Sequence, residues 1–422
     1  MMHLKRVIIS LLVVCASPTA GQNMERVRHN IATLCSPSMA GRGYSGKGDK
    51  KAAQWIAETF RAIGVKPVGK SYFQPFPIDV NTFPSKMKLV VDGKKLQPGR
   101  DFIPSPVSAR GKGYLKTIFL SDLARCTDSL IDRLKQINYK KKAILFNLPD
   151  YYQLLETCPE LVHQLNQAAL WIGITDPLTA QIGEQALSPP FLWVTKEVID
   201  SSAQRIRFCV KNQLKKNYIT QNVIGYIKGT IAPEKFIVFA AHYDHLGTIG
   251  KGIYIPGAND NAAGVAMLIE LAHYFSEHPP ALSVCFMAFS AEELGLLGST
   301  YYVQHPLFPL ASIRFVWNLD LVGTGKEGAT IVNGTLHPKE FQRLQRFNDS
   351  LQALPKLVPR SPAANSDHYP FSTRGVPSFF VYLMDSSYPY YHHIEDKADK
   401  LPLTGFEGLF RLLVAFTAQG VR

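Results

Sequence analysis

The sequence predicts an α/β protein that carries an inserted β-rich domain. From about residue 222 onward, apolar strand-like runs alternate with amphipathic helical patterns, which indicates helices packed against a sheet. Between about residues 84 and 209, short β-rich runs alternate instead with proline-rich turns. The chain has 422 residues, 46% of them hydrophobic, so it is long and apolar enough to bury more than one core.

The beginning of the chain has the pattern of a cleaved secretory signal: a basic start, an apolar run over residues 7–16 and small residues around Gly21. We therefore predict a signal peptide at residues 1–21 and an exported protein, periplasmic or secreted. The apolar run is too short for stable membrane insertion. A lipoprotein acylated at Cys15 is the less favoured alternative, because Val14 stands where a small residue is expected.

The rest of the chain divides into three segments. Residues 22–83 are predicted to form the first part of the main domain, as a helix, a glycine-rich loop and a second helix that ends near Gly64. Short β-runs bounded by proline, glycine and charged residues predict a separately packed β-rich insert over residues 84–209. Residues 210–422, where strands alternate with helices, complete the main domain.

Charge and cysteine usage exclude some classes of function. The formal charge is +13, but the lysines are scattered, and the densest run, Lys140–Lys142, has no interleaved aromatic residues, so we expect no nucleic-acid partner. No CxxC motif is present, which argues against a zinc ribbon or a thioredoxin-like site. One disulfide among Cys126, Cys158 and Cys209 is allowed in an oxidising compartment, and Cys285 is expected to be a buried free thiol. The sequence does not indicate an oligomeric state.

Residues that can bind a metal follow five consecutive elements of the predicted sheet. Since ligands collect at the carboxyl ends of strands in such sheets, we expect these side chains to meet at one edge. Burying several carboxylates together is costly unless a cation compensates them. Each residue alone has an ordinary explanation, such as a helix N-cap for an aspartate, but five in this order predict a metal site. The five are His242, Asp260, Glu293, Asp320 and His392.

Two imidazoles and three carboxylates, without a thiolate, favour zinc, and we predict two ions per chain. Asp260 is expected to bridge the two ions. His242 and Asp320 would complete the first ion, and Glu293 and His392 the second.

Two further carboxylates are expected to act beside the metals. Asp244, two residues beyond His242, suits a carboxylate that orients the site. Glu292 cannot point in the same direction as its neighbour Glu293, because adjacent side chains diverge. A free carboxylate beside a metal-bound water is what a general base requires, so we assign that role to Glu292.

The motifs around these residues resemble a known family. HYDH, GANDNAAG, SAEELGLLGS, NLDLVG, SDHYPF and YHHIEDKADKL are similar to motifs of the co-catalytic zinc aminopeptidases that include the aminopeptidase Y and aminopeptidase S types. Glutamate carboxypeptidase and the glutaminyl cyclases are relatives of this family. The resemblance covers about residues 25–80 and 215–422, and it implies a three-layer α/β/α sandwich around a mixed, largely parallel sheet, as in zinc exopeptidases. It also implies the same ligand set, with Glu292 as base, and a protease-associated-like insert.

The chain departs from the family pattern at several positions. His393 follows the ligand histidine and competes with it, but Tyr391 keeps the family's register and favours His392. His245 extends HYD to HYDH, and we expect it to lie behind a ligand or to face solvent. Tyr391 either donates to the developing oxyanion or packs beside the site. The segment SDHYPF is expected to line the substrate pocket with Ser366, Asp367 and His368.

The predicted activity is metal-assisted hydrolysis of peptide substrates. Zinc polarises the scissile carbonyl and activates a water, and Glu292 takes its proton and returns it to the leaving amine. A centre that also holds the free α-amine favours removal of the N-terminal residue. A glutaminyl cyclase, a carboxypeptidase and a non-catalytic binding protein are the alternatives. The insert is predicted to contribute no metal ligand, and either to narrow access to the site or only to stabilise the fold.

Overall fold

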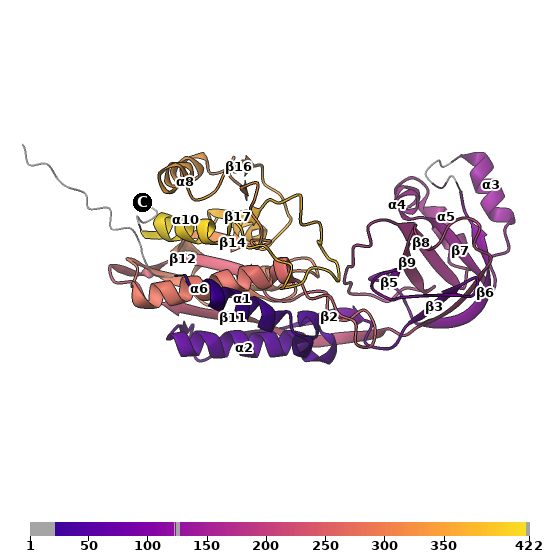
Figure 1. Cartoon of the computed structure of the whole chain (residues 1–422), viewed down its shortest axis with the longest axis horizontal. Helices are drawn as coiled ribbons and strands as arrows, with labels where there is room; N and C mark the ends of the chain where they lie inside the picture. Colours follow the sequence, from indigo (N-terminus) through magenta and orange to yellow (C-terminus); the bar gives the residue numbers. More distant parts are fainter. Residues whose placement is uncertain (1–21, 122, 124–126, 419–422) are drawn as a thin grey trace, which may run out of the picture.

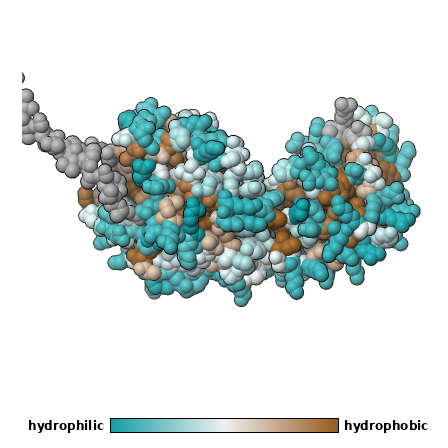
Figure 2. Space-filling view, viewed as in Figure 1, coloured by the Kyte–Doolittle hydropathy of each residue, from teal (hydrophilic) through white to brown (hydrophobic). Residues whose placement is uncertain are grey.

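The computed structural model describes residues 22–121, 123 and 127–418. The predicted signal peptide, with Cys15, and also Cys126 lie outside these residues. The described chain forms two lobes, each built around its own sheet (Figure 1), and a hollow separates them on one face (Figure 2). Among the described helices we find no segment with the length and apolarity that a bilayer crossing requires.

The first lobe contains a nine-stranded sheet in the order β1-β11-β13-β12-β14-β17-β15-β16, with β2 also paired to β11. The four central strands β13, β12, β14 and β17 run parallel, whereas β11 and β15 join them antiparallel on either side. The bounds are β1 (Lys66–Pro67), β2 (Phe73–Thr82), β11 (Gln213–Ile227), β12 (Ala232–His242), β13 (Leu282–Phe289), β14 (Ile313–Leu319), β15 (Ala329–Val332), β16 (Leu357–Arg360) and β17 (Ser378–Leu383).

Helices cover both faces of this sheet because its central strands are apolar on both sides. On β12, Ile237 and Phe239 pack into one core, and Val238 and Ala240 pack into the other. The first core lies under α1 (Met24–Leu34), α2 (Gly48–Ile63), α6 (Ala263–Glu277), α8 (Pro338–Leu351) and α10 (Phe406–Ala418). The second lies under α7 (Leu297–Gln304) and α9 (His368–Thr373). The predicted α/β fold with a mixed sheet is confirmed: the central four strands are parallel, and so are β15 and β16 at one edge.

Short helical segments complete this lobe: η1 (Pro37–Arg42), η2 (Ser45–Lys47), η3 (Ala258–Ala262) and η4 (Leu310–Ser312). The turn η3 leads directly into α6, whose N-terminal two thirds is buried on every side. An all-round apolar helix must be enclosed by its neighbours, and α6 is packed between the sheet and α1, α2 and α10. It therefore gives η3 a rigid base.

The second lobe contains an eight-stranded sheet in the order β4-β3-β10-β6-β7-β8-β9-β5, with β6 to β9 parallel. Its strands are β3 (Lys88–Val91), β4 (Lys94–Leu96), β5 (Phe102–Pro104), β6 (Gly111–Phe119), β7 (Lys142–Asn147), β8 (Leu170–Thr175), β9 (Phe191–Thr195) and β10 (Arg205–Val210). The insert was predicted to be β-rich, and no helix was assigned within it, but parallel strands need crossovers. Three helices, α3 (Asp128–Gln136), α4 (Leu148–Thr157) and α5 (Pro159–Leu165), occur between these strands.

The chain leaves the first sheet along β2 and returns to it along β11. These two strands pair antiparallel from Phe73↔Val223 to Thr82↔Gln213, so the two ends of the inserted segment lie side by side (Figure 1). Of the cysteines predicted as disulfide candidates, Cys209 is free and Cys158 is disulfide-bonded. Cys285 is a buried free thiol in β13, as its apolar strand predicted.

Candidate metal centre

The parallel strands of the first sheet deliver the predicted ligands to one edge. His242 is the last residue of β12 and pairs with Phe289, the last residue of β13. Glu292 and Glu293 follow β13, and Asp320 follows β14 directly. The two remaining ligands come from the turn η3, which carries Asp260, and from the loop after β17, which carries His392.

Asp260 lies at the centre of the cluster and contacts both histidines. Its Oδ1 is 3.2 Å from Nε2 of His242, and its Oδ2 is 3.1 Å from Nε2 of His392. Nε2 of His242 is also 3.3 Å from Oδ1 of Asp320, and Nε2 of His392 is 3.1 Å from Oε2 of Glu293. Each histidine thus lies near one oxygen of Asp260 and near one further carboxylate, Asp320 for His242 and Glu293 for His392. This is the pairing expected for two bridged ions.

The other nitrogen of His242 is held by backbone. Its Nδ1 is 3.2 Å from the carbonyl oxygen of Asp244, so an Nδ1–H donor leaves Nε2 free to face the cluster. The carboxylate of Asp244 is farther from this ring, at 3.9 Å. It accepts instead from the Tyr44 hydroxyl at 2.9 Å and from the Glu292 amide at 3.1 Å. Asp244 therefore positions the Glu292 loop as well as His242.

His392 is held in the same way from outside its own lobe. Its Nδ1 is 3.0 Å from the carbonyl oxygen of Ala180, a residue of the inserted segment. The His392 ring stacks on the Tyr391 ring, with centroids 3.8 Å apart, and Tyr391 is 55% exposed over the site. His393 lines a different cavity, so of the two adjacent histidines only His392 reaches Asp260 and Glu293.

The pKa values of two adjacent glutamates are shifted in opposite directions. Burial, together with the negative charges of Asp320 and Glu293, raises the pKa of Glu292 well above its ordinary value. Burial also opposes ionisation of Glu293, but the neighbouring His392 and His245 lower its pKa to about 2. A carboxyl pair whose pKa values are pushed apart is typical of separate roles, one as a ligand and one as an acid or base.

The cluster has the donors and the charge that two divalent cations need. Burial opposes protonation of His242, yet Asp320 and Glu292 raise its pKa well above the ordinary value. Burial likewise opposes protonation of His392, and Glu293 and Asp260 raise its pKa. Side chains that so strongly attract protons attract a metal cation for the same reason. Nitrogen and oxygen donors without thiolate fit zinc.

His245 is closer to the cluster than the sequence indicated. It is fully buried, and its Nδ1 lies 2.6 Å from Oε1 of Glu293, so it does not face solvent. Its Nε2 is buried and has no hydrogen-bond partner within the described residues. Together with Asp260 and Glu293 it forms one of the groups whose atoms lie close enough to hold an ion. Its other expected place, behind a ligand, matches the contact with Glu293.

The expectation that SDHYPF lines the substrate pocket needs correction. Ser366, Asp367 and His368 are all fully buried, and none of them lines the cavity over the cluster. Ser366 donates to Oδ2 of Asp320 at 2.7 Å, and Asp367 accepts from Ser299 at 2.5 Å. The segment starts a short helix beneath the sheet edge, so it supports Asp320 from behind.

A cavity of about 270 Å³ opens over the cluster, and several of its lining residues were not predicted. They lie after β14, within β17, at the end of β16 and in the loop before α9, and their residue types alone do not indicate a metal or acid–base site. Besides the cluster and Tyr391, the lining residues are Leu321, Arg360, Asn365, Phe380 and Tyr382.

A buried arginine ties together the loops that carry the ligands. Arg42 is fully buried, and its guanidinium donates to the backbone carbonyls of Leu34, Tyr243, Pro256, Gly257 and Asp260. Among them, the Tyr243 carbonyl directly follows His242 in the chain, and the Asp260 carbonyl belongs to the proposed bridging residue. The glycine-rich loop that precedes α2 therefore belongs to the site, which its sequence did not indicate.

Fold and site together define a class of α/β protein in which a histidine–carboxylate cluster suited to a metal lies at the carboxyl edge of the sheet. Residues 222–417 match the model of peptidase family M28. This part of the chain, which contains all the predicted ligands, therefore belongs to peptidase family M28 and forms a peptidase domain. The predicted resemblance is confirmed.

Individual relatives agree with that placement. Aminopeptidase YwaD of Bacillus subtilis is 28% identical over 256 residues, which cover 58% of this chain and 54% of the relative. A probable zinc metalloprotease of Pyricularia oryzae is 35% identical over 134 residues, covering 31% of this chain and 25% of the relative. The alignments thus span about half of the first relative's length and a quarter of the second's.

Solved structures agree on the fold of most of the chain. A zinc aminopeptidase from Bacillus subtilis superimposes with a TM-score of 0.70 at 21% identity, covering 94% of each chain. An aminopeptidase from Aneurinibacillus sp. strain AM-1 gives a TM-score of 0.64 at 20% identity, covering 95% of each chain. Both likenesses extend over the inserted lobe as well as the peptidase domain.

Proposed function

We propose that this protein is an exported di-zinc aminopeptidase that removes the N-terminal residue from peptides. The observation that carries the proposal is the position of Asp260, whose two oxygens each lie near a different histidine while Glu292 stands free beside them. The aminopeptidases named above share the family or the fold, which supports an exopeptidase over other metallohydrolases.

Two zinc ions fit the donor set. His242 and Asp320 would hold one ion, Glu293 and His392 the other, and Asp260 would bridge them. Zinc bound here would supply Lewis acidity for the scissile carbonyl and would lower the pKa of a water.

Glu292 is the residue to which we assign proton transfer. Its amide donates to Asp244, which fixes the loop, while its carboxylate is left outside the pairings of the two histidines. A raised pKa suits a group that accepts a proton from water and then gives it to the leaving amine. Tyr391, which is half exposed over the cluster, is within the cavity lining and is available to donate to the carbonyl oxygen.

The size and charge of the cavity favour the N-terminus of a peptide. About 270 Å³ accommodates one residue better than an extended chain, and a free α-amine can be held against zinc or a carboxylate at its base. Peptides are accordingly the proposed partners, without nucleic acid and without stable membrane insertion. Export is proposed from the signal-like pattern of residues 1–21, and the disulfide-bonded Cys158 is in keeping with an oxidising compartment.

A panel of aminoacyl-4-nitroanilides, combined with zinc analysis of the purified protein, tests the proposal. We expect hydrolysis with a free α-amine, none after N-acetylation, loss of activity with a chelator and recovery with zinc. Gln-amide in parallel with Leu-amide separates the cyclase alternative, since a cyclase would release ammonia from Gln-amide alone. Cleavage of N-blocked peptides from their C-terminus would replace the proposal with a carboxypeptidase.

A further inference from the structure

We infer that the inserted lobe is part of the metal centre: the backbone carbonyl of Ala180 holds the imidazole of His392 in the orientation in which it binds zinc. The inference rests on the proposed function for the identity of the metal. It concerns a positioning role, because Ala180 contacts a proposed ligand and not the ion.

The contact is reciprocal. Nδ1 of His392 is 3.0 Å from the Ala180 oxygen, and the Ala180 amide donates to the His392 oxygen at 3.1 Å. A carbonyl accepts only, so the imidazole must carry its proton on Nδ1, and Nε2 presents its lone pair to Asp260 and Glu293. Such outer contacts fix the tautomer and the ring orientation of metal-binding histidines.

The two histidines of the centre are held by different lobes. His242 finds its carbonyl two residues along its own chain, at Asp244. His392 finds its carbonyl 212 residues away, in the loop between β8 and β9. The Nδ1 contact of His242, a proposed ligand of the first ion, therefore lies inside the peptidase domain. The Nδ1 contact of His392, a proposed ligand of the second ion, joins the two lobes.

The loop that carries Ala180 is firmly anchored. Ala180 itself is 3% exposed and packs in the core of the inserted lobe. Farther along, the carbonyl of Gly183 accepts from the Asn81 amide at 2.7 Å, and Ile182 packs against the cluster that contains Tyr44 and Ala291. The loop thus contacts β2 and the segment next to Glu292, which keeps the Ala180 carbonyl at a defined place.

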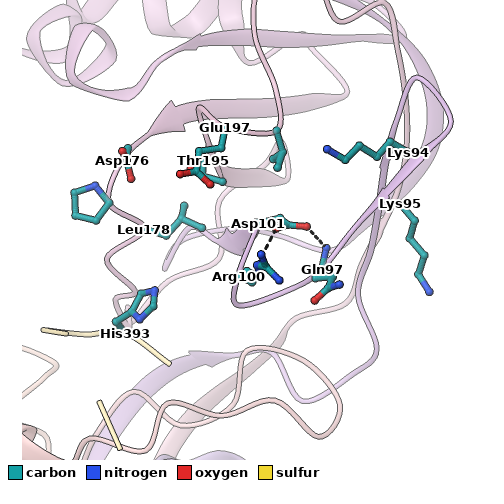
Figure 3. Close-up of a pocket in the computed structure, with 12 residues that line it drawn as sticks. Lys94, Lys95, Gln97, Arg100, Asp101, Asp176, Leu178, Thr195, Glu197 and His393 are labelled. Atoms are coloured by element: carbon teal, nitrogen blue, oxygen red, sulfur yellow. Dashed lines mark hydrogen bonds and ion pairs between the residues drawn. The ribbon is translucent and has the colours of Figure 1, made fainter. Parts of the chain in front are cut away.

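The segment after His392 also packs on the inserted lobe. Ile394 packs against the lobe's core. His393 lines a cavity of about 450 Å³ whose other walls, including Asp176 and Leu178, come from that lobe (Figure 3). Two three-residue segments, Leu178 to Ala180 and His392 to Ile394, therefore meet along one seam. A shift of the inserted lobe would move His392 with it.

A main-chain ester tests the inference without altering a core side chain. Gln181 is exposed, and its amide donates no hydrogen bond within the described chain. Placing lactic acid at position 181 turns the Ala180 carbonyl into an ester carbonyl, which is a weaker acceptor. The matched control is Gln181→Ala, which differs only in the amide. A second ester with its own amide control, at the exposed Gln185 of the same loop, controls for the chemistry.

Zinc affinity is the readout, measured by competition with a chromophoric chelator in the full-length protein. His392→Gln first shows which of two binding steps depends on His392. We expect the ester at position 181 to lower the zinc affinity of the His392-dependent binding step about tenfold relative to Gln181→Ala. The zinc affinity of the other binding step should change less than about twofold. The ester at 185 should change neither. ¹⁵N-histidine spectra should show the Nδ1–H tautomer of His392 in the control and a weakened signal in the ester.

The outcomes separate this inference from the proposed function. Equal affinities in the ester and its control would overturn the inference, as would an equal weakening of both steps, which would indicate a general loosening. If Gln181→Ala binds only one zinc, the two-ion proposal is wrong. The inference then stands if the ester weakens that single ion and falls if it does not.

Discussion

At the scale of single residues, Glu292 and Glu293 show how one bond along the chain separates two roles. The Glu293 carboxylate contacts His392 and His245, whereas that of Glu292 contacts neither. We predict that Glu292→Gln lowers kcat by about 10²–10⁴-fold with both zinc ions retained, because the amide keeps the shape but accepts no proton. Elemental analysis alongside turnover checks this. In the parallel Glu293→Gln variant zinc should be lost, and the reverse pattern would mean that the two roles are exchanged.

Asp260 supplies the second residue-scale prediction. Since one of its oxygens lies near each histidine, Asp260→Ala should reduce both zinc sites together and lower zinc content well below one ion per chain. Asp320→Ala serves as the comparison, because Asp320 contacts His242 alone of the two histidines and should cost mainly one ion. Two tightly held ions in Asp260→Ala would rule out the bridging role.

The sequence was informative about this site where chemistry resides in side chains. His242, Asp260, Glu293, Asp320 and His392 come together as expected, because strand ends of one parallel sheet share an edge. Contacts made by backbone groups could not be predicted from the sequence. The Ala180 carbonyl has no residue type that announces it, and Ser366 to His368 resemble pocket residues until burial is known.

At the scale of elements, the glycine-rich loop between α1 and α2 acts through Arg42. Arg42→Met would leave five backbone carbonyls without their shared donor, in a place from which water is excluded. Unpaired buried groups of this kind cost about 1–3 kcal/mol each, so we predict a loss of more than about 3 kcal/mol in the free energy of unfolding. Urea denaturation measures it. The exposed Arg28→Met on α1 should change the free energy of unfolding by less than about 0.5 kcal/mol. A similarly small change in Arg42→Met would refute the role of Arg42 in holding the loops together.

Elements were predictable in proportion to their periodicity. The apolar strands β12, β13 and β14 are read directly from the sequence, as is α2, which Gly64 ends in a left-handed conformation. The helices of the inserted lobe were not, because α3, α4 and α5 are short and mostly half exposed. Their apolar residues are too few to establish a helical repeat against a background of β-rich runs.

At the scale of the whole molecule, His368 links stability to pH. Burial lowers its pKa to about 4, while an unfolded chain has a histidine pKa of about 6.5. The unfolded state then binds more protons, so the stability due to neutral His368 is complete above pH ~6.5 and is lost as pH falls toward ~4. The loss amounts to at most about 3 kcal/mol.

The measurement is urea denaturation of metal-free protein between pH 7 and pH 4, since protonated ligands would otherwise release zinc. His368→Phe should flatten the curve in this window, because phenylalanine packs beside Phe380 without titrating. An unchanged pH dependence in His368→Phe would assign the effect to other groups.

The arrangement of Arg42 also has a consequence for the order of assembly. Its carbonyl partners at Tyr243 and Asp260 are 201 and 218 positions farther along the chain. The inserted lobe is continuous in sequence and can pack as soon as it is synthesised. The peptidase domain is built from segments before and after the inserted lobe, so it can pack only once both have been synthesised. Contacts between distant segments form late, since closing long loops is costly in entropy. The hydrolytic machinery is therefore completed near the end of folding, so a growing chain carries no finished peptidase beside its own unfolded segments.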